Sequence, residues 1–395
     1  MKSGWQTKKL GEVCVIVNGG TPKTSIKEYW GGGNYWITPA EMGKRSSPYI
    51  DETDRTITDL GLQNCSATSL PPYSVILSSR APIGHLVINI KPMATNQGCK
   101  GLVPSKLLDH KFLYFYLSSI VGLLNNLGTG ATFKEISGGK LKEVSVPLPP
   151  LPEQRRIVAI LDEAFRGIAT AKTNTEKNLK NARELFESYL QSIFTQRGDG
   201  WVEKRLGDVC EFIGGSQPPK STFEKTETAE NIRLIQIRDY KSEKHLVFIP
   251  RSLARRFCTV DDVMIGRYGP PIFQILRGLK GAYNVALMKS VPDDAKLSRE
   301  FLFYFLKHSA IQQYVIFHSE RAAGQSGLNK ETIEPYPIAL PPLAVQHRIV
   351  AKIDTLFTET QRLESLYRKK LLALDELKQS LLHQAFIGQL SGNVP

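Results

Sequence analysis

Cysteine is scarce in this sequence, and its positions argue against two common kinds of stabilising site. The chain has 395 residues and 5 cysteines, and no two of them are spaced as CxxC. Disulfide frameworks and structural zinc sites use paired, regularly spaced cysteines. We therefore expect free thiols that are buried or half-buried, in a reducing cytoplasm. The cysteines are Cys14, Cys65, Cys99, Cys210 and Cys258.

Long hydrophobic runs are also missing. No stretch of eighteen or more apolar residues occurs, so we expect no membrane span. The first residues, MKSGWQTKKL, lack the apolar core of a secretory signal. A hydrophobic fraction of 41% with 23% charged residues is typical of a soluble globular protein. The length favours two or three domains.

Motifs for covalent chemistry are absent as well. The sequence has no GxxxxGK[ST] loop and no glycine-rich strand–loop–helix that fits a nucleotide or S-adenosylmethionine. PLPPLP lacks the amide or acid and the aromatic of the Asn/Asp-Pro-Pro-aromatic motif of amino-methyltransferases. PDDAK (Pro292–Lys296) crowds acids and a lysine into one turn, and the 7 histidines show no ligand spacing. We expect no catalytic residues, no metal and no cofactor bound by this chain.

What the chain has in excess is positive charge. The formal net charge is +13, from 51 basic and 38 acidic residues. Residues 1–150 carry 16 basic and 10 acidic side chains, and residues 201–340 carry 20 and 16. A basic excess favours a polyanionic partner, because Lys and Arg displace counterions from phosphates. Many basic proteins bind no nucleic acid, so charge alone leaves the partner open.

The sequence also contains two similar copies of one unit. LPPLPEQRRIVAILDEAF (Leu148–Phe165) returns as LPPLAVQHRIVAKIDTLF (Leu340–Phe357). The openings GWQTKKLGEVC, from Gly4, and GWVEKRLGDVC, from Gly200, also match. A single duplication of about 195 residues explains these pairs better than a solenoid of short repeats. Further pairs are LYFYL (Leu113–Leu117) with LFYFL (Leu302–Leu306), and ELFESYLQSIF (Glu184–Phe194) with ELKQSLLHQAF (Glu376–Phe386).

Each copy begins with a mixed part of about 150 residues. YSVILSS (Tyr73–Ser79) and DDVMIGR (Asp261–Arg267) are short apolar runs between turn residues and predict strands. Phe112–Leu124 and Phe301–Phe317 are longer, aromatic-rich and predict buried helices.

Each copy ends in a long amphipathic helix. Pro152 and Glu153 suit the first turn of the first helix, and RGDG (Arg197–Gly200) and Gly388 are stop signals. Apolar residues recur at steps of three and four, which is typical of a coiled-coil seam. They are Ile157, Leu161, Phe165, Ile168, Leu179, Ala182, Phe186, Tyr189 and Ile193, and then Ile349, Ile353, Leu356, Leu363, Tyr367, Leu371, Leu374, Leu377, Leu381 and Ala385.

These helices need partners for their apolar stripes. If the two copies are related by a pseudo-twofold axis, the helices pair antiparallel as a spacer between the mixed domains. The alternative is that each helix packs on its own globular part. The predicted fold class is α+β, with two pseudo-twofold-related mixed α/β domains separated by an antiparallel coiled coil of two long helices. The predicted segments are domain 1 (1–150), helix 1 (151–197), domain 2 (198–342), helix 2 (343–388) and a C-terminal tail (389–395).

Both mixed domains carry basic, amide, hydroxyl and aromatic residues in glycine-rich loops. Glycine lets backbone N–H groups approach phosphates, Arg suits guanine, and Asn or Gln suits adenine. An ordinary surface or turn role is the alternative for each residue taken singly. The candidate DNA-binding residues are Lys23, Lys44, Arg45, Ser79, Arg80, Asn96, Gln97, Thr132, Lys134, Lys220, Arg238, Arg267, Tyr268, Asn284, Arg321 and Gln325.

The whole chain resembles the specificity subunit of type I restriction-modification systems. The resemblance rests on PLPPLPEQRRIVAILD before a long helix, on its second copy, and on the GW…LG-[ED]-V opening of each half. In one departure, Ala344 and Val345 stand where the first copy has Pro152 and Glu153. The first helix therefore has the better N-terminal signals.

The resemblance implies two target-recognition domains, each reading half of a bipartite site in double-stranded DNA, with the coiled coil setting the gap between the halves. It further implies two modification (methyltransferase) subunits that bind S-adenosylmethionine, and restriction subunits that act as ATP-dependent translocase and nuclease. This chain would itself be non-catalytic. The alternatives are a stand-alone DNA methyltransferase or nuclease with an unfamiliar site, and a basic scaffold that binds protein or RNA.

Overall fold

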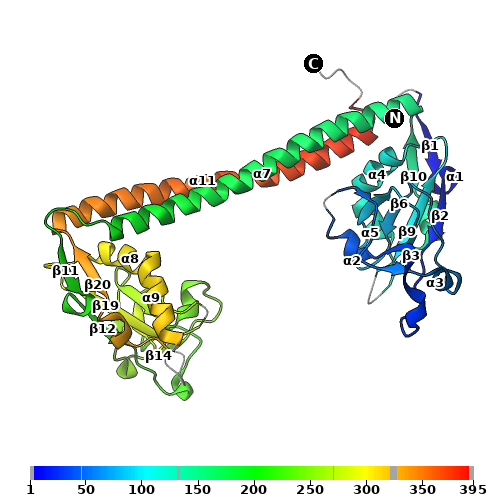
Figure 1. Cartoon of the computed structure of the whole chain (residues 1–395). Coiled ribbons are helices and arrows are strands. Elements are labelled where there is room, and N and C mark those ends of the chain that lie inside the picture. Colours follow the sequence, from blue (N-terminus) through cyan, green and yellow to red (C-terminus); the bar gives the residue numbers. More distant parts are fainter. Residues whose placement is uncertain (1–3, 46, 131–133, 270, 321–326, 391–395) are drawn as a thin grey trace. The chain divides into compact units, whose positions relative to one another are not determined.

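The computed structural model describes residues 4–45, 47–130, 134–269, 271–320 and 327–390. They divide into two compact units (Figure 1). Unit 1 comprises Met1–Thr175 and Lys369–Pro395, and unit 2 comprises Glu176–Arg368. The long helices α7 (Leu151–Thr195) and α11 (Leu343–Phe386) each contribute to both units.

Unit 1 is built on a five-stranded sheet in the order β2-β9-β6-β7-β4. A second sheet has the order β5-β3-β8, and β1 pairs with β10 in a separate antiparallel ribbon. The strands are β1 (Gln6–Lys9), β2 (Cys14–Asn18), β3 (Trp30–Ile37), β4 (Tyr49–Ile50), β5 (Thr56–Ile57), β6 (Val75–Ser78), β7 (Leu86–Asn89), β8 (Met93–Thr95), β9 (Cys99–Pro104) and β10 (Ser145–Leu148).

The central strand of unit 1 is buried on both faces, as its unbroken apolar run predicts. Val75 and Leu77 of β6 face a core that also contains side chains from α4, α6, α7 and α11, while Ile76 faces a second core beneath β3 and α2. The helices of this unit, besides the long ones, are α1 (Leu10–Val13), the short η1 (Lys27–Tyr29), α2 (Pro39–Met42), α3 (Asp59–Gln63), α4 (His110–Ser119), α5 (Val121–Leu127) and α6 (Gly138–Lys142).

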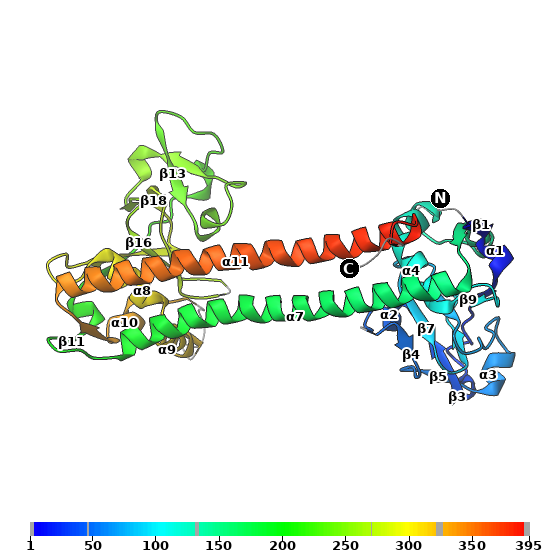
Figure 2. The same cartoon turned by 90° about the horizontal axis from the view of Figure 1, so that it is seen from above.

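Unit 2 repeats this plan. Its main sheet has the order β12-β19-β16-β17, a second sheet the order β14-β13-β18-β15, and β11 pairs with β20. Figure 2 shows β13 and β18 in a lobe of their own. The strands are β11 (Val202–Arg205), β12 (Cys210–Gly214), β13 (Asn231–Ile235), β14 (Phe248–Pro250), β15 (Phe257–Cys258), β16 (Val263–Gly266), β17 (Gln274–Leu276), β18 (Gly281–Tyr283), β19 (Leu287–Pro292) and β20 (Pro337–Leu340).

The core of unit 2 has the same layered arrangement. Val263 and Ile265 of β16 face the core that α8 and the long helices share, and Met264 faces a second core. The shorter helices are η2 (Leu206–Asp208), η3 (Lys220–Thr222), η4 (Ile237–Tyr240), η5 (Arg251–Leu253), α8 (Arg299–Lys307), α9 (Ser309–Glu320) and α10 (Lys330–Ile333). The duplication seen in the sequence is therefore also a duplication of topology.

The repeated LG-[ED]-V opening is explained by one close packing contact. Leu10 and Leu206 are fully buried. A Cβ on Gly11 would lie 3.0 Å from Cβ of Lys142, at the end of α6, and a Cβ on Gly207 would lie 2.9 Å from Cβ of Glu334, just after α10. A side chain at either glycine would therefore force these segments apart.

The glutamine of LPPLPEQRRIVAILDEAF, which is repeated as Gln346 in the second copy, is buried and holds two helices together. Gln154 Nε2 donates to the carbonyls of Leu107 (2.9 Å) and Pro149 (2.8 Å), and its Oε1 accepts from the N–H of Asp109, the N-cap of α4 (2.8 Å). The amide thus ties the start of α7 to the start of α4. Because the amide is fully buried and Pro149 is buried too, its loss would leave buried polar groups without partners.

Gln346 does the same in unit 2. It donates to the carbonyls of Lys296 (2.7 Å) and Pro341 (2.9 Å), and it accepts from the N–H of Ser298, the N-cap of α8 (2.9 Å). Both glutamines are fully buried. The buried glutamine therefore persists although Ala344 and Val345 replace the proline and glutamate before it.

Within unit 1, the two long helices run antiparallel. Lys172 pairs with Asp375, and Lys378 lies over the ring of Phe165, 5.1 Å from its centroid. As residue numbers increase along α7, from Phe165 to Lys172, the residue numbers of their partners on α11 decrease, from Lys378 to Asp375. Ile157 and Leu161 of α7 join Leu382 and Ala385 of α11 in the core beside α4.

Within unit 2, the helices again run antiparallel. Arg183 donates to both carboxylate oxygens of Glu364 at 3.0 Å, and the rings of Phe186 and Phe357 lie 5.4 Å apart. Phe194 leaves the seam and packs instead against Phe301, with ring centroids 5.3 Å apart. The predicted pairing and the alternative, packing on the globular part, therefore occur together in each unit.

The prediction that Leu377 lies in the buried seam is wrong, because this residue is 47% exposed. Leu382, further along α11, is 1% exposed. Near this end of α11 the buried face turns toward the globular core of unit 1, which contains Phe112. A pattern drawn for helix pairing alone misses that second partner. The predicted buried helices also divide, at Ile120 and at His308, into α4 with α5 and α8 with α9.

Candidate nucleic-acid interface

Loops from several strands converge at one edge of unit 1. Asn18 of β2 lies opposite Lys100 of β9, and Ser78 of β6 lies opposite Cys99. The carboxyl ends of β2 and β6 therefore meet the start of β9. We call this edge loop edge 1, and it comprises residues 19–24, 79–85, 96–98, 128–130 and 134–136.

The same edge exists in unit 2. Gly214 of β12 lies opposite Met288 of β19, and Gly266 of β16 lies opposite Leu287. We call this edge loop edge 2, and its described residues are 215–221, 267–269, 271–273, 284–286 and 327–329.

One glycine in each edge permits a close crossing of two loops. A Cβ on Gly19 would lie 1.9 Å from the carbonyl oxygen of Asn96, and a Cβ on Gly215 would lie 1.9 Å from that of Asn284. No side chain fits there, so glycine at this position keeps the loop after β2 or β12 against the loop before β9 or β19.

Both asparagines shape these crossings. Asn96 Oδ1 accepts from the N–H of Gly98 at 2.7 Å and its Nδ2 donates to Thr21 Oγ1 at 3.0 Å. Asn284 Oδ1 accepts from the N–H of Ala286 at 3.1 Å. Each asparagine side chain therefore stabilises the turn that follows it, by accepting a hydrogen bond from the N–H two residues later.

The candidate residues of unit 1 divide by accessibility. Four of them have exposed side chains: Lys23, Lys44, Gln97 and Lys134. Arg45 is held by buried Glu41 at 2.7 Å and by the carbonyl of Glu52. Ser79 is fully buried, so its hydroxyl does not reach the surface in this structure.

Arg80 is held at the surface by an acidic residue that the sequence analysis missed. Glu135 lies 3.8 Å from Arg80 Nη1 and 3.5 Å from Nζ of the buried Lys100. Its position next to Lys134 was a weak signal, because an acid in a basic loop commonly orients a cation. Lys100 was hidden within the apolar pattern of β9.

The described candidate residues of unit 2 lie on or beside loop edge 2. Lys220 is exposed at the start of η3. Arg238, in η4, donates to the carbonyl of His245 and lies 3.8 Å from Asp239. Tyr268 is 39% exposed. Thr132, Arg321 and Gln325 lie outside the described residues.

Arg267 differs from the others, because every nitrogen of its guanidinium already has a partner. Nε donates to the carbonyl of Leu328 (2.7 Å), Nη1 to that of Val285 (3.2 Å) and Nη2 to Oδ1 of Asn329 (3.0 Å). These acceptors belong to two different loops, so the side chain joins both to the end of β16.

Four of the five cysteines are buried, and burial disfavours their thiolate forms. Burial raises the pKa of Cys14 and of Cys99 to about 12, and that of Cys258 to about 11. Burial also raises the pKa of Cys210. Cys65, the remaining cysteine, is half-buried.

Across the described ranges we find no group of His, Cys, Asp and Glu that could hold a metal ion. The helices of the described chain include none with the length and apolarity of a membrane span.

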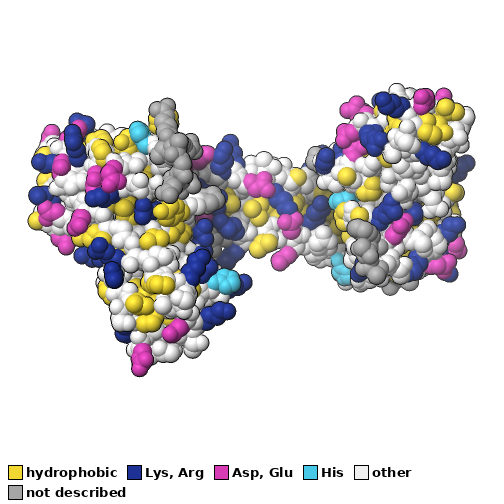
Figure 3. Space-filling model, turned by 90° about the horizontal axis from the view of Figure 1, so that it is seen from below, with side chains coloured by type: hydrophobic (Ala, Val, Ile, Leu, Met, Phe, Trp, Pro, Cys, Tyr) yellow, Lys and Arg dark blue, Asp and Glu magenta, His cyan; other side chains and the backbone are white. Residues whose placement is uncertain are grey.

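Basic side chains are spread over both units. On the face in Figure 3, Lys and Arg side chains alternate with acidic ones over each unit instead of forming one continuous patch. This distribution agrees with the charge excess in both mixed parts of the sequence, and it gives each loop edge its own set of cations.

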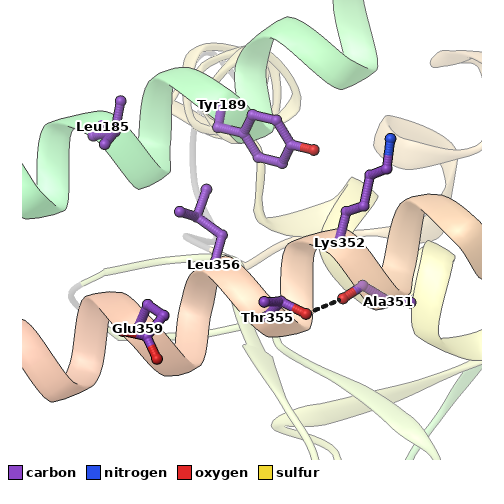
Figure 4. A pocket seen from close by; sticks show the side chains of 7 residues that line it. All are labelled: Leu185, Tyr189, Ala351, Lys352, Thr355, Leu356 and Glu359. Carbon is purple, nitrogen blue, oxygen red and sulfur yellow. Dashed lines mark hydrogen bonds between the residues drawn. The ribbon is translucent and has the colours of Figure 1, made fainter.

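Unit 2 also has an apolar groove between its two long helices, with a volume of about 580 Å³. In Figure 4, Leu356 of α11 points toward α7, between Leu185 and Tyr189. Leu185 is 64% exposed. Lys352 and Glu359 also line the groove, so it combines apolar and charged side chains, as protein-binding surfaces do.

The sequence matches the family model of the type I restriction modification DNA specificity domain twice, at residues 2–181 and again at residues 198–372. The chain belongs to this family. The two matches correspond to the two copies of the duplication.

Curated relatives cover nearly the whole chain. The specificity subunit of the type I restriction enzyme MjaIX of Methanocaldococcus jannaschii is 26% identical, over 98% of this chain and 93% of its own. Among solved structures, a chain from a study of assembly and conformational transition of the type I R-M system has a TM-score of 0.80 at 21% identity, covering 98% of this chain and 99% of its own. The HsdS subunit from Thermoanaerobacter tengcongensis has a TM-score of 0.66 at 19% identity, covering 98% of each chain. These structures support the two-domain α/β fold with long helices.

Proposed function

We propose that this specificity subunit reads a bipartite site in double-stranded DNA, with loop edge 1 on one half of the site and loop edge 2 on the other. The observation that carries this proposal is the pairing of like frames with unlike side chains. The N–H of Ser79 donates to Gly98 O, and that of Arg267 donates to Ala286 O. The two residues therefore occupy the same position, one a buried serine and the other an arginine, and they align the neighbouring residues of the two loop edges.

The neighbouring positions differ in the same way. Arg80 of unit 1 corresponds to Tyr268 of unit 2, and Gln97 corresponds to Val285. Side chains at such positions distinguish bases by hydrogen bonding and by contact with methyl groups. Two frames with different residues suit a site whose halves differ in sequence.

The chain itself is proposed to be non-catalytic and to bind no cofactor. Raised thiol pKa values and the lack of cofactor motifs in the sequence support this view. S-adenosylmethionine is expected on two modification subunits, and restriction subunits complete the complex. The apolar groove at Leu185 and Leu356 is a candidate docking surface for a modification subunit. A cytoplasmic location fits the free thiols.

Methylome sequencing of cells that express this chain with its modification subunit tests the proposal. We expect a bipartite methylated motif that disappears when the gene for this chain is removed. Methyl transfer to DNA by the purified chain alone would instead favour the alternative of a stand-alone methyltransferase. A persistent motif after removal of the gene would assign recognition to another protein.

A further inference from the structure

We propose that Arg267 is a positioning residue that does not contact DNA, and that it sets the surface which Tyr268 presents to the DNA. The inference rests on the proposed function, because it assigns roles within loop edge 2. It differs from the expectation from sequence that Arg267 is a DNA-binding residue.

The guanidinium of Arg267 is already engaged within the protein. Its three nitrogens donate to Leu328 O, Val285 O and Asn329 Oδ1, at 2.7 to 3.2 Å. Contact with guanine uses the same planar fork in a bidentate geometry. A bidentate contact through Nε and Nη2 would require Arg267 to give up its partly buried bond to Leu328 O and its bond to Asn329 Oδ1.

The backbone around Arg267 shows what the side chain adds. Its N–H donates to Ala286 O at 2.9 Å, and its carbonyl accepts from the N–H of Leu328 at 3.0 Å. In unit 1, Ser79 makes the equivalent bonds, to Gly98 O and from Ile136 N–H. The frame therefore forms without an arginine, and the side chain provides a second fastening that is particular to unit 2.

Tyr268 is the side chain that this fastening orients. Arg267 Cζ lies 5.5 Å from the centroid of the tyrosine ring. On the loop held through Leu328 and Asn329, a Cβ on Gly327 would lie 2.3 Å from Tyr268 Cε1. The ring is thus seated on the backbone of a loop that Arg267 holds in place, and its remaining exposed surface belongs to loop edge 2.

The test uses the chain assembled with its modification subunits, and a DNA duplex carrying the motif found for the unchanged chain. We expect Arg267→Ala to weaken binding roughly tenfold or more, the size expected when base contacts are displaced. The slope of log affinity against log salt concentration should not change, because no phosphate contact is lost. The methylated motif should relax at several base pairs of one half.

Arg267→Lys is the decisive variant. Lysine cannot reproduce a planar fork with three acceptors, so it should behave like alanine. If Arg267 instead bound a phosphate, lysine would restore affinity, and alanine would lower the salt slope by about 0.9. Either result would overturn the inference, as would relaxation at one base pair alone.

Further variants separate loop positioning from general loss of folding. Asn329→Ala removes one acceptor and should cause a smaller change of the same kind. Lys204→Ala removes a positive charge from β11, outside loop edge 2, and should leave the motif unchanged. If the unchanged chain gives no bipartite motif, the proposed function fails; if the motif exists and Arg267→Lys matches the unchanged chain, only the positioning role fails.

Discussion

The buried glutamines Gln154 and Gln346 test how much the repeated segment at the start of each long helix contributes to stability. Gln154→Met keeps the length of the side chain but removes its amide. Three hydrogen bonds disappear, to Leu107 O, Pro149 O and from Asp109 N–H. With about 1 kcal/mol for each bond and up to about 3 for a stranded buried partner, the free energy of unfolding of unit 1 should fall by about 2–5 kcal/mol.

For a unit of about 200 residues, this loss lowers the melting temperature by roughly 5–15 °C. Thermal unfolding followed by hydrogen exchange and mass spectrometry assigns the loss to peptides of unit 1 or unit 2. Gln346→Met should cause a loss of similar size in unit 2, because its amide makes the equivalent bonds. Gln361→Met is the matched control, since Gln361 is exposed on α11.

Gln154→Glu adds a second readout. One carboxylate oxygen would face the carbonyls that now accept from Nε2, so burial and repulsion should raise the pKa of the new acid. A raised pKa means that stability is lost as the pH rises, so this variant should recover part of its stability on acidification. Melting temperatures of Gln154→Met and Gln346→Met within about 2 °C of the unchanged chain would refute the claim that these buried amides stabilise the two units.

Further predictions concern the core, the seam and the spacer. Burial lowers the pKa of His308 below its ordinary value, so the stability that its neutral form contributes is lost as the pH falls through about 6.5. His308→Phe should therefore flatten the decline in the melting temperature of unit 2 between pH 7 and pH 5. An equally steep decline in this variant would contradict the prediction. Arg183→Ala breaks an exposed ion pair with Glu364 and should lower the free energy of unfolding only slightly. Phe186→Ala should lower it more, and urea unfolding that gives the opposite order would argue against an apolar seam. Four residues inserted after Thr175 add about 6 Å to a helix, and the methylated motif should then gain one or two base pairs in its spacer; an unchanged spacer would mean that other subunits set the gap.

Sequence patterns predicted the elements whose signals are local. Apolar runs located β6 and β16, and the period of three and four located the long helices, which end at Thr195 and Phe386. The duplication predicted that both halves would share a topology. Each of these features is determined by neighbouring residues along the chain.

Features that depend on contacts between distant segments were not predictable in this way. Gln154 was one polar residue at a helix start, and its partner Asp109 lies 45 residues away. Arg267 was a candidate DNA-binding residue, and the sequence did not show its acceptor Leu328 O, 61 residues later in the chain. Leu377 fitted the seam period, but it points away from the core that holds Leu382.

The assignment of one half of the DNA site to each unit can be tested by exchanging one mixed domain. Residues 1–150 would be replaced by the corresponding domain of another family member, with the rest of the chain unchanged, and the methylome sequenced in cells that supply the modification subunits. We predict that one half of the methylated motif changes while the other half stays the same. A change in both halves, or in neither, would contradict the assignment.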